Sequence, residues 1–216
     1  MKDFGLSRDV PVEKGKAALL FIDVQKYSAP DGGAYAHLGP EEIEATYGYF
    51  FREMRERAIP NMQRLQRAAR AAGVEVMYTV IESLTEDGRD LSLDYKISRL
   101  FCPKGSRDAE VLDEIAPIRD EILIPKTSSS VFVSTHIHYV LGNLGVKYLI
   151  LAGVLTDQCV DSAVRDACDL GYLVTLATDA CATLSAVRHE SALANNRGYC
   201  RQVPTERIVA ELAAFS

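Results

Sequence analysis

Cys159 is the residue of this sequence best placed to act as a nucleophile. It follows an apolar segment, residues 148–152, and a turn, residues 153–158, and it opens an amphipathic helical pattern that runs to about Gly171. A thiol in the first turn of a helix faces unpaired backbone N–H groups and the positive end of the helix dipole, and both favour the thiolate. The position equally suits a buried structural cysteine, which is usually unreactive.

Two other residues with useful chemistry stand directly after apolar segments. Asp23 follows residues 17–22, and Lys126 follows residues 122–125. Each has an ordinary explanation, because an Asp after a strand often caps a turn and a Lys after Pro is usually solvated. Together with Cys159 they suggest more, since a carboxylate can take the proton of a thiol and an ammonium group stabilises both anions. The three residue types therefore predict nucleophilic catalysis.

The elements that must position these residues alternate along the chain. Apolar segments predict strands buried on both faces at residues 17–22, 74–81, 122–124, 148–152 and 172–177. Helical patterns lie at about residues 59–72, 131–144, 160–170, 185–196 and 205–214. This alternation predicts an α/β fold with a mostly parallel sheet covered on both sides. The carboxyl ends of such strands form the ligand-binding edge, where Asp23, Lys126 and Cys159 should meet.

Two stretches interrupt the alternation. Residues 26–57 are rich in aromatic residues, and residues 82–105 are rich in charge. Long loops are often functional, so we expect a substrate lid or a contact between subunits. The alternative is that the aromatic residues only cover the edge of the sheet. Four charged residues of the second stretch are candidates to select a charged substrate or are ordinary surface charge: Glu82, Arg89, Lys96 and Arg99.

The length and composition narrow the class of protein. The 216 residues, 48% of them hydrophobic, suffice for a single domain spanning residues 1–216. A net charge of −6 argues against nucleic-acid or membrane partners. The five cysteines show no paired C-x-x-C spacing, and no export signal or membrane span is apparent, so we expect a cytoplasmic protein.

Three separated motifs carry a family resemblance. They are F-I-D-V-Q at residues 21–25, the stretch from Lys126 to Thr135, and G-V-L-T-D-Q-C-V at residues 153–160. Together, in this order, they resemble the isochorismatase-like cysteine hydrolase superfamily, over about residues 16–204. Its amidase members include nicotinamidases, N-carbamoylsarcosine amidases and ureidoacrylate or biuret hydrolases.

The resemblance implies a three-layer α/β/α sandwich with Asp23, Lys126 and Cys159 as the catalytic triad. It also implies a cis peptide between Val154 and Leu155. The backbone N–H groups of Leu155 and Cys159 would then form an oxyanion hole, in which losing one donor typically costs about 10² to 10³ in rate. We further expect substrate contacts from Gln25, Tyr27, Glu82 and Phe132, and no cofactor.

Nicotinamidases of this superfamily carry a metal site that this sequence does not match. Residues 78–83 contain no Asp-x-His, and His37 is the one histidine between the first and third predicted strands. His136 and His138 are two residues apart and so do not share a helix face, and His189 stands on another pattern. We therefore predict no metal and disfavour nicotinamide as the substrate.

The function predicted from the sequence is hydrolysis of a small amide, carbamoyl or ureido compound through a thioester, releasing ammonia or an amine. One alternative is an isochorismatase-type vinyl ether hydrolase, which by resemblance does not depend on the cysteine. Another is a non-catalytic or redox-sensing member of the fold, in which Cys168, Cys181 or Cys200 would pair with an oxidised Cys159. The resemblance also suggests a homo-oligomer, a dimer or tetramer, with residues 27–51 as contact surface.

Overall fold

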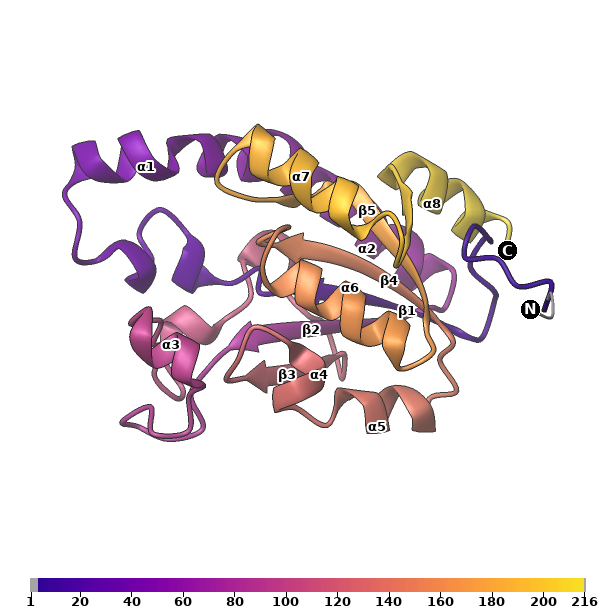
Figure 1. Cartoon of the computed structure of the whole chain (residues 1–216), viewed down its shortest axis with the longest axis horizontal. Coiled ribbons are helices and arrows are strands. Elements are labelled where there is room, and N and C mark those ends of the chain that lie inside the picture. Colours follow the sequence, from indigo (N-terminus) through magenta and orange to yellow (C-terminus); the bar gives the residue numbers. More distant parts are fainter. Residues whose placement is uncertain (1–3, 216) are drawn as a thin grey trace.

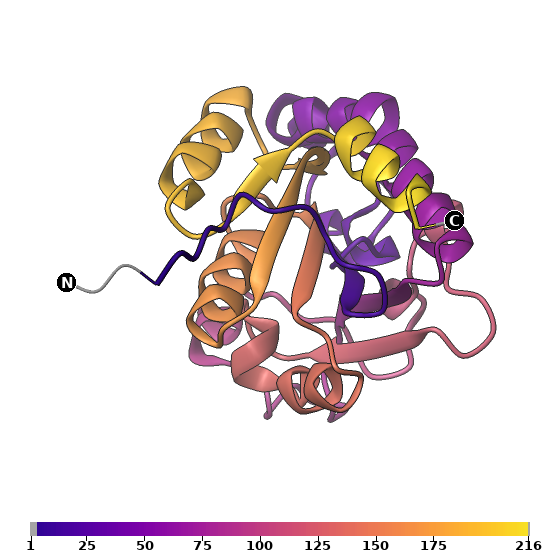
Figure 2. The same ribbon diagram turned by 90° about the vertical axis from the view of Figure 1, so that its right-hand side faces the viewer.

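A parallel sheet forms the centre of the molecule, and helices cover both of its faces (Figures 1 and 2). The structure is a computed structural model that describes residues 4–215. Within these residues the sheet has six strands, in the order β3-β2-β1-β4-β5-β6, and every neighbouring pair is parallel. The strands are β1 (Ala17–Ile22), β2 (Glu75–Ile81), β3 (Ile122–Lys126), β4 (Tyr148–Val154), β5 (Leu173–Ala182) and β6 (Arg201–Val203). The predicted three-layer α/β/α fold is confirmed.

The sequence of β1 explains why both faces of the sheet are covered. All six of its residues are apolar and buried. Alternate side chains of a strand point to opposite faces, and those of Ala17, Leu19 and Phe21 join one hydrophobic core. The side chains of Ala18, Leu20 and Ile22 join the core on the other face. β1 lies between β2 and β4, so its end is flanked by strands on both sides.

The helices divide between the two faces. Apolar residues of α2 (Ile59–Ala71) and α8 (Thr205–Ala213) line one core, and those of α4 (Val131–Ser134), α5 (Ile137–Asn143) and α6 (Cys159–Asp169) line the other. α7 (Ala186–Asn196) runs beside α6 (Figure 1). The remaining helices are α1 (Pro40–Glu53) and the short α3 (Leu93–Ile97). Short 3-10 turns lie at Lys26–Ser28, Gly33–Tyr35, Arg107–Ala109 and Asp113–Ile115.

The helix predicted from residue 59 begins much earlier in the structure. α1 starts at Pro40 and continues through a π-helical turn, η3 (Met54–Ala58), directly into α2. Pro40 has the fixed φ of a first helical residue, and Glu41 and Glu42 complement the positive end of the helix dipole. The aromatic stretch is therefore partly helical, and α1 projects beyond the body of the molecule (Figure 1).

The single helix predicted over residues 131–144 is wrong, because the structure has two helices there. Thr135 is extended between α4 and α5, with φ −139° and ψ 174°. Its hydroxyl donates to the Val131 carbonyl and accepts from the Ile137 N–H, so it ends α4 and is bonded to the first residue of α5.

The sheet is also longer than the sequence indicates. β4 and β5 extend to Val154 and Ala182, and β6 was not predicted. β6 has three residues, two of them polar, and gives no apolar pattern. No helix in residues 4–215 is both long and apolar enough to cross a membrane.

Candidate active site

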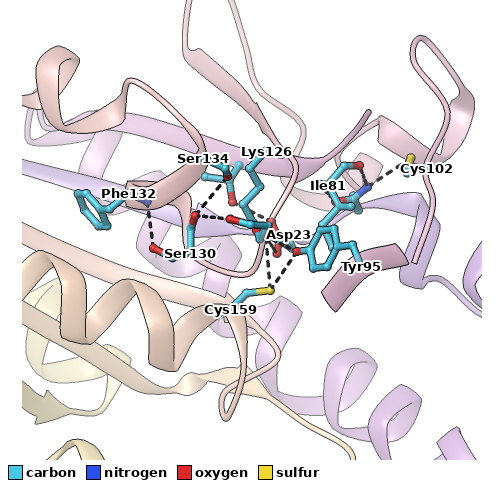
Figure 3. Close-up of polar contacts among 12 residues, drawn as sticks. Asp23, Ile81, Tyr95, Cys102, Lys126, Ser130, Phe132, Ser134 and Cys159 are labelled. Atoms are coloured by element: carbon cyan, nitrogen blue, oxygen red, sulfur yellow. Dashed lines mark hydrogen bonds and ion pairs between the residues drawn. The ribbon is translucent and has the colours of Figure 1, made fainter. Parts of the chain in front are cut away.

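Asp23, Lys126 and Cys159 meet at the carboxyl edge of the sheet (Figure 3). Asp23 directly follows β1, Lys126 is the last residue of β3, and Cys159 is the first residue of α6. The Lys126 Nζ lies 2.8 Å from the Asp23 Oδ2 and 3.4 Å from the Cys159 Sγ. β2 separates β1 from β3, so a side chain as long as lysine is needed to span the distance. The convergence predicted from the strand ends is present.

The backbone of Asp23 leaves the β conformation and turns its carboxylate inward. Its φ is 55°, in the left-handed region that Asp and Asn tolerate better than most residues. Its N–H donates to the Thr79 carbonyl, and the Thr79 hydroxyl donates to its Oδ1 at 2.9 Å. Its buried Oδ2 receives no aligned hydrogen bond within residues 4–215, although Lys126 is close. The Asp23 carboxylate is thus paired with the ammonium group and also placed to accept the proton of the Cys159 thiol.

Gly153 brings β4 against the end of β1. Its φ is +134°, and a Cβ at this position would lie 2.2 Å from the Ile22 carbonyl oxygen. Any side chain would push away the residue before Asp23, so only glycine permits this approach.

The turn between β4 and α6 contains the cis peptide that the resemblance implied, between Val154 and Leu155. The Thr156 N–H donates to the Ala182 carbonyl, which fixes the turn to β5. Within residues 4–215 no hydrogen bond leaves the backbone N–H of Leu155 or Cys159. Both donors are therefore available to a ligand.

Charge and burial decide the protonation of the cluster. Burial raises the pKa of the Cys159 thiol to about 12, the Asp23 carboxylate raises it further, and Lys126 only partly opposes them. The expectation that the helix N-terminus would favour the thiolate is therefore wrong for the free protein. Cys159 is only 6% exposed, and the cost of desolvating the thiolate, together with the Asp23 charge, outweighs the helix N-terminus. Burial alone lowers the pKa of Lys126, but the Asp23 carboxylate and the sulfur outweigh it, so the net pKa is raised.

Tyr95 is a member of the cluster that the sequence did not reveal. It is 1% exposed, and its hydroxyl lies 2.8 Å from the Lys126 Nζ and 3.8 Å from the Cys159 Sγ (Figure 3). The Lys126 ammonium also lies 5.5 Å from the centre of the Tyr95 ring, within the range of a cation–π contact. Burial raises the pKa of Tyr95, so its hydroxyl stays protonated at neutral pH.

The charged stretch at residues 82–105 carries Tyr95 on α3. The Ser92 hydroxyl caps this helix by accepting from the Tyr95 N–H, and the Ser92 N–H donates to the Thr127 carbonyl just after β3. The Ser83 N–H donates to the Cys102 carbonyl, and this hydrogen bond joins the two ends of the stretch. The one sequence signal for this arrangement was Ser92, a good N-cap residue three positions before Tyr95.

Gln25 and Glu82, predicted to contact substrate, are engaged by the protein itself. The Gln25 amide donates to the carbonyls of Ile81 and Asp108, each at 2.9 Å, and thereby ties the end of β2 to the end of β1. The Glu82 carboxylate accepts from the Gly105 N–H at 2.7 Å.

Tyr27 and Phe132 occupy different places relative to the triad. Tyr27 packs in a small cluster with Ile81, Leu91 and Tyr95, so it supports the tyrosine beside the sulfur. The Phe132 ring packs against the Tyr172 ring, with centroids 6.0 Å apart, and points away from the triad (Figure 3). The structure does not bring Phe132 to the sulfur.

The charged residues suggested for substrate selection are mostly exposed. Arg89 pairs with Asp87, and Lys96 donates to the Arg89 carbonyl. Arg99 is exposed, with φ 55°. None of these three residues contacts the triad in the described contacts.

The histidines make individual contacts. The His138 Nδ1 lies 2.9 Å from the Tyr172 hydroxyl, and the His189 Nδ1 lies 2.9 Å from the Thr156 hydroxyl. Among residues 4–215 there is no group of three or more His, Cys, Asp or Glu side chains placed to hold a metal ion.

Comparison with known sequences places the chain in a family. The profile of the Isochorismatase domain matches residues 17–207, which include Asp23, Lys126 and Cys159. Curated relatives include ureidoacrylate amidohydrolase RutB from Rhizobium rhizogenes, 29% identical over 187 residues, covering 79% of this chain and 72% of the relative. The corresponding protein of Agrobacterium fabrum is also 29% identical, with coverage of 79% and 78%.

Solved structures show the same fold. A cysteine hydrolase from Pseudomonas syringae superposes with a TM-score of 0.79 at 22% identity, over 96% of this chain and 97% of the other. N-carbamoylsarcosine amidase from Thermoplasma acidophilum superposes with a TM-score of 0.65 at 21% identity, over 88% and 97% of the two chains. Since the family profile spans most of the sequence and the folds agree, this chain belongs to the isochorismatase-like hydrolase family.

Proposed function

We propose that this protein is a cysteine-dependent amidohydrolase, which cleaves the C–N bond of a small amide, carbamoyl or ureido compound. The observation that carries the proposal is the contact of three groups at one edge of the sheet: the Asp23 carboxylate, the Lys126 ammonium and the Cys159 sulfur. The relatives named ureidoacrylate amidohydrolase support the same class of substrate.

Because the resting sulfur is a thiol, the first step must remove its proton. The Asp23 Oδ2, which lacks an aligned hydrogen bond, accepts that proton while the sulfur attacks the substrate carbonyl carbon. Lys126 stays charged throughout and offsets the negative charge that moves between sulfur and carboxylate. Burial, which makes the thiolate costly in the free protein, also strengthens this electrostatic stabilisation.

The tetrahedral intermediate carries its negative charge on the former carbonyl oxygen. The N–H groups of Leu155 and Cys159 hold this oxygen, and both are without an acceptor in the described residues. Asp23 then returns the proton to the departing nitrogen, and ammonia or an amine leaves a thioester on Cys159. A water molecule attacks the thioester carbonyl and gives a proton to Asp23. Collapse releases the acid product, and the proton passes from Asp23 back to the sulfur.

The test uses the purified protein with a panel of small neutral amides, carbamoyl compounds and ureides, and measures released ammonia. Cys159→Ala should abolish release. Cys168→Ala is the matched control, since Cys168 lies on the same helix, α6, and is half-buried outside the cluster, and it should retain activity. Intact mass measured during turnover should show an acyl adduct that peptide mapping assigns to Cys159.

Other outcomes would redirect the assignment. Ammonia release that survives Cys159→Ala would reject covalent catalysis. Hydrolysis of isochorismate by both wild type and Cys159→Ala, without activity on any amide, would favour the vinyl ether reaction. Absence of all hydrolysis, together with a disulfide on Cys159 after peroxide treatment, would favour a redox sensor.

A further inference from the structure

The hydroxyl group of Tyr95 contacts two members of the triad at once. It lies 2.8 Å from the Lys126 Nζ and 3.8 Å from the Cys159 Sγ. An ammonium group has no lone pair, so Lys126 must donate and the tyrosine oxygen must accept. The phenolic hydrogen is then left for another acceptor, and the sulfur is the partner within reach.

The contact with Lys126 makes this hydroxyl a stronger donor. Hydrogen bonds in a chain polarise one another, and a hydroxyl that accepts from a cation holds its own hydrogen less tightly. Few other donors serve the sulfur, because the Lys126 ammonium group is shared among several partners. Its Nζ lies 2.8 Å from the Asp23 Oδ2, the Tyr95 hydroxyl and the Ser128 carbonyl, and only at the longer distance of 3.4 Å from the Cys159 Sγ. A second hydrogen-bond donor would therefore help to stabilise negative charge on the sulfur.

Tyr95 is also held firmly in place. It is buried beside Tyr27, Ile81 and Leu91, and its helix is capped by Ser92 and bonded to Thr127. A hydroxyl fixed in this way needs little reorganisation when charge develops on the sulfur, which is the condition for effective electrostatic stabilisation.

We propose that Tyr95 is a fourth catalytic residue, whose hydroxyl donates a hydrogen bond to the Cys159 sulfur whenever that sulfur is negatively charged. This inference rests on the proposed function. The sulfur carries negative charge twice in the cycle, first as its proton passes to Asp23 and before its bond to the carbonyl carbon is complete, and again when the thioester breaks. In both states the proton of Tyr95 remains on its own oxygen, so the tyrosine stabilises charge without acting as acid or base.

The test is Tyr95→Phe, which keeps the ring and removes only the hydroxyl. Its first readout is the rate at which iodoacetamide alkylates Cys159 in the free protein at pH 7.5, measured by peptide mass spectrometry. A hydrogen bond to a charged group corresponds to about a ten- to hundred-fold effect, so alkylation should slow by that factor. Amide hydrolysis should slow in parallel. A purely structural tyrosine would change the unfolding temperature but leave alkylation unaltered.

Tyr172→Phe is the matched control. Tyr172 is 7% exposed and its hydroxyl bonds to His138 rather than to the triad, so its loss should leave Cys159 alkylation at the wild-type rate. Alkylation of Tyr95→Phe within about twofold of wild type would overturn the proposal, even if hydrolysis fell. Slower alkylation in Tyr95→Phe, with no amide hydrolysed even by wild type, would support the hydrogen bond and reject the proposed function instead.

A second substitution decides the matter if Tyr95→Phe fails to fold. Replacing Tyr95 with 3-fluorotyrosine keeps the hydroxyl and makes it a stronger donor. The proposal then expects faster alkylation of Cys159 than in wild type, and an unchanged or slower rate would overturn it.

Discussion

The ammonium group of Lys126 lies 2.8 Å from the carboxylate of Asp23, and the two side chains are only 0% and 3% exposed. Burying two charges carries a large desolvation penalty, which their mutual attraction offsets only while both are present. Removing either side chain would therefore leave the other charge buried without a counter-ion and destabilise the folded protein, whether or not the two residues act in catalysis.

Replacing Lys126 alone should destabilise the protein strongly. We expect Lys126→Met to lower the free energy of unfolding by about 3–5 kcal/mol, because it leaves the Asp23 carboxylate buried without a counter-ion. The double variant Asp23→Asn with Lys126→Met should recover most of the loss, since asparagine also tolerates the left-handed backbone. Urea unfolding of the three proteins measures both effects. A double variant no more stable than Lys126→Met would contradict this account.

The control for that series is Lys16→Met. Lys16 forms an ion pair with Glu13 in which both side chains are about half exposed, and such surface pairs contribute little. The change should leave the midpoint of urea unfolding close to that of wild type.

The ion pair of Lys126 and Asp23 should also make the free energy of unfolding depend on pH. The pKa of Lys126 is raised in the folded protein, so its stabilising effect is complete below the unfolded value of about 10.4 and is lost as pH rises through the higher folded value. The difference in unfolding free energy between wild type and Lys126→Met should hence stay constant from about pH 7 to 10 and shrink above it. Chemical denaturation across this range tests the sign. A difference that grows between neutral pH and pH 10 would mean that Lys126 is already neutral in the folded protein at these pH values.

Asp23→Asn should separate the reactivity of the thiol from catalysis. The negative charge of Asp23 raises the pKa of Cys159, so removing it should lower that pKa and increase the thiolate fraction. We expect faster alkylation of Cys159 by iodoacetamide at pH 8 but loss of amide hydrolysis, because asparagine cannot pass a proton to the leaving nitrogen. Parallel loss of alkylation and hydrolysis would show instead that Asp23 is required to generate the thiolate in the free protein.

Gly153→Ala should disturb the site through the backbone. The added methyl group would lie 2.2 Å from the Ile22 carbonyl oxygen, one residue before Asp23, and φ at this position is +134°. We expect overpacking to lower the free energy of unfolding by about 1–3 kcal/mol and to reduce the rate of amide hydrolysis. Thermal unfolding and an ammonia assay measure the two effects.

Gly142→Ala in α5 is the corresponding control. A Cβ there has open space around it, so alanine should be neutral or stabilise the helix by about 0.5–1 kcal/mol. Equal effects of the two substitutions would argue against the tight approach of β4 to β1.

The sequence alone predicted the strands and helices that are marked by the residue types within their own segment. The apolar run of β1 was predicted at its observed bounds, because every residue of a central parallel strand is buried and the chain must be continuously apolar. Asp23, Lys126 and Cys159 could be chosen for the same reason, since the end of a strand fixes the edge to which a residue belongs. α1 was missed although Pro40 and its acidic neighbours marked its start, because the aromatic stretch was interpreted as a loop.

Only the tertiary structure decided the properties that depend on neighbours distant in the chain. The helix start at Cys159 suggested a thiolate, but enclosure by β1, β3 and α3 beside the Asp23 charge raises the pKa of the thiol. Gln25 was predicted from the sequence to contact substrate, and only the structure shows that its amide also joins the end of β1 to the end of β2. Tyr95 carried no sequence signal of its role, because its contacts are with residues 31 and 64 positions away. Residue type and periodicity are encoded locally, whereas burial, charge and hydrogen-bond partners arise only when the folded chain brings separate segments together.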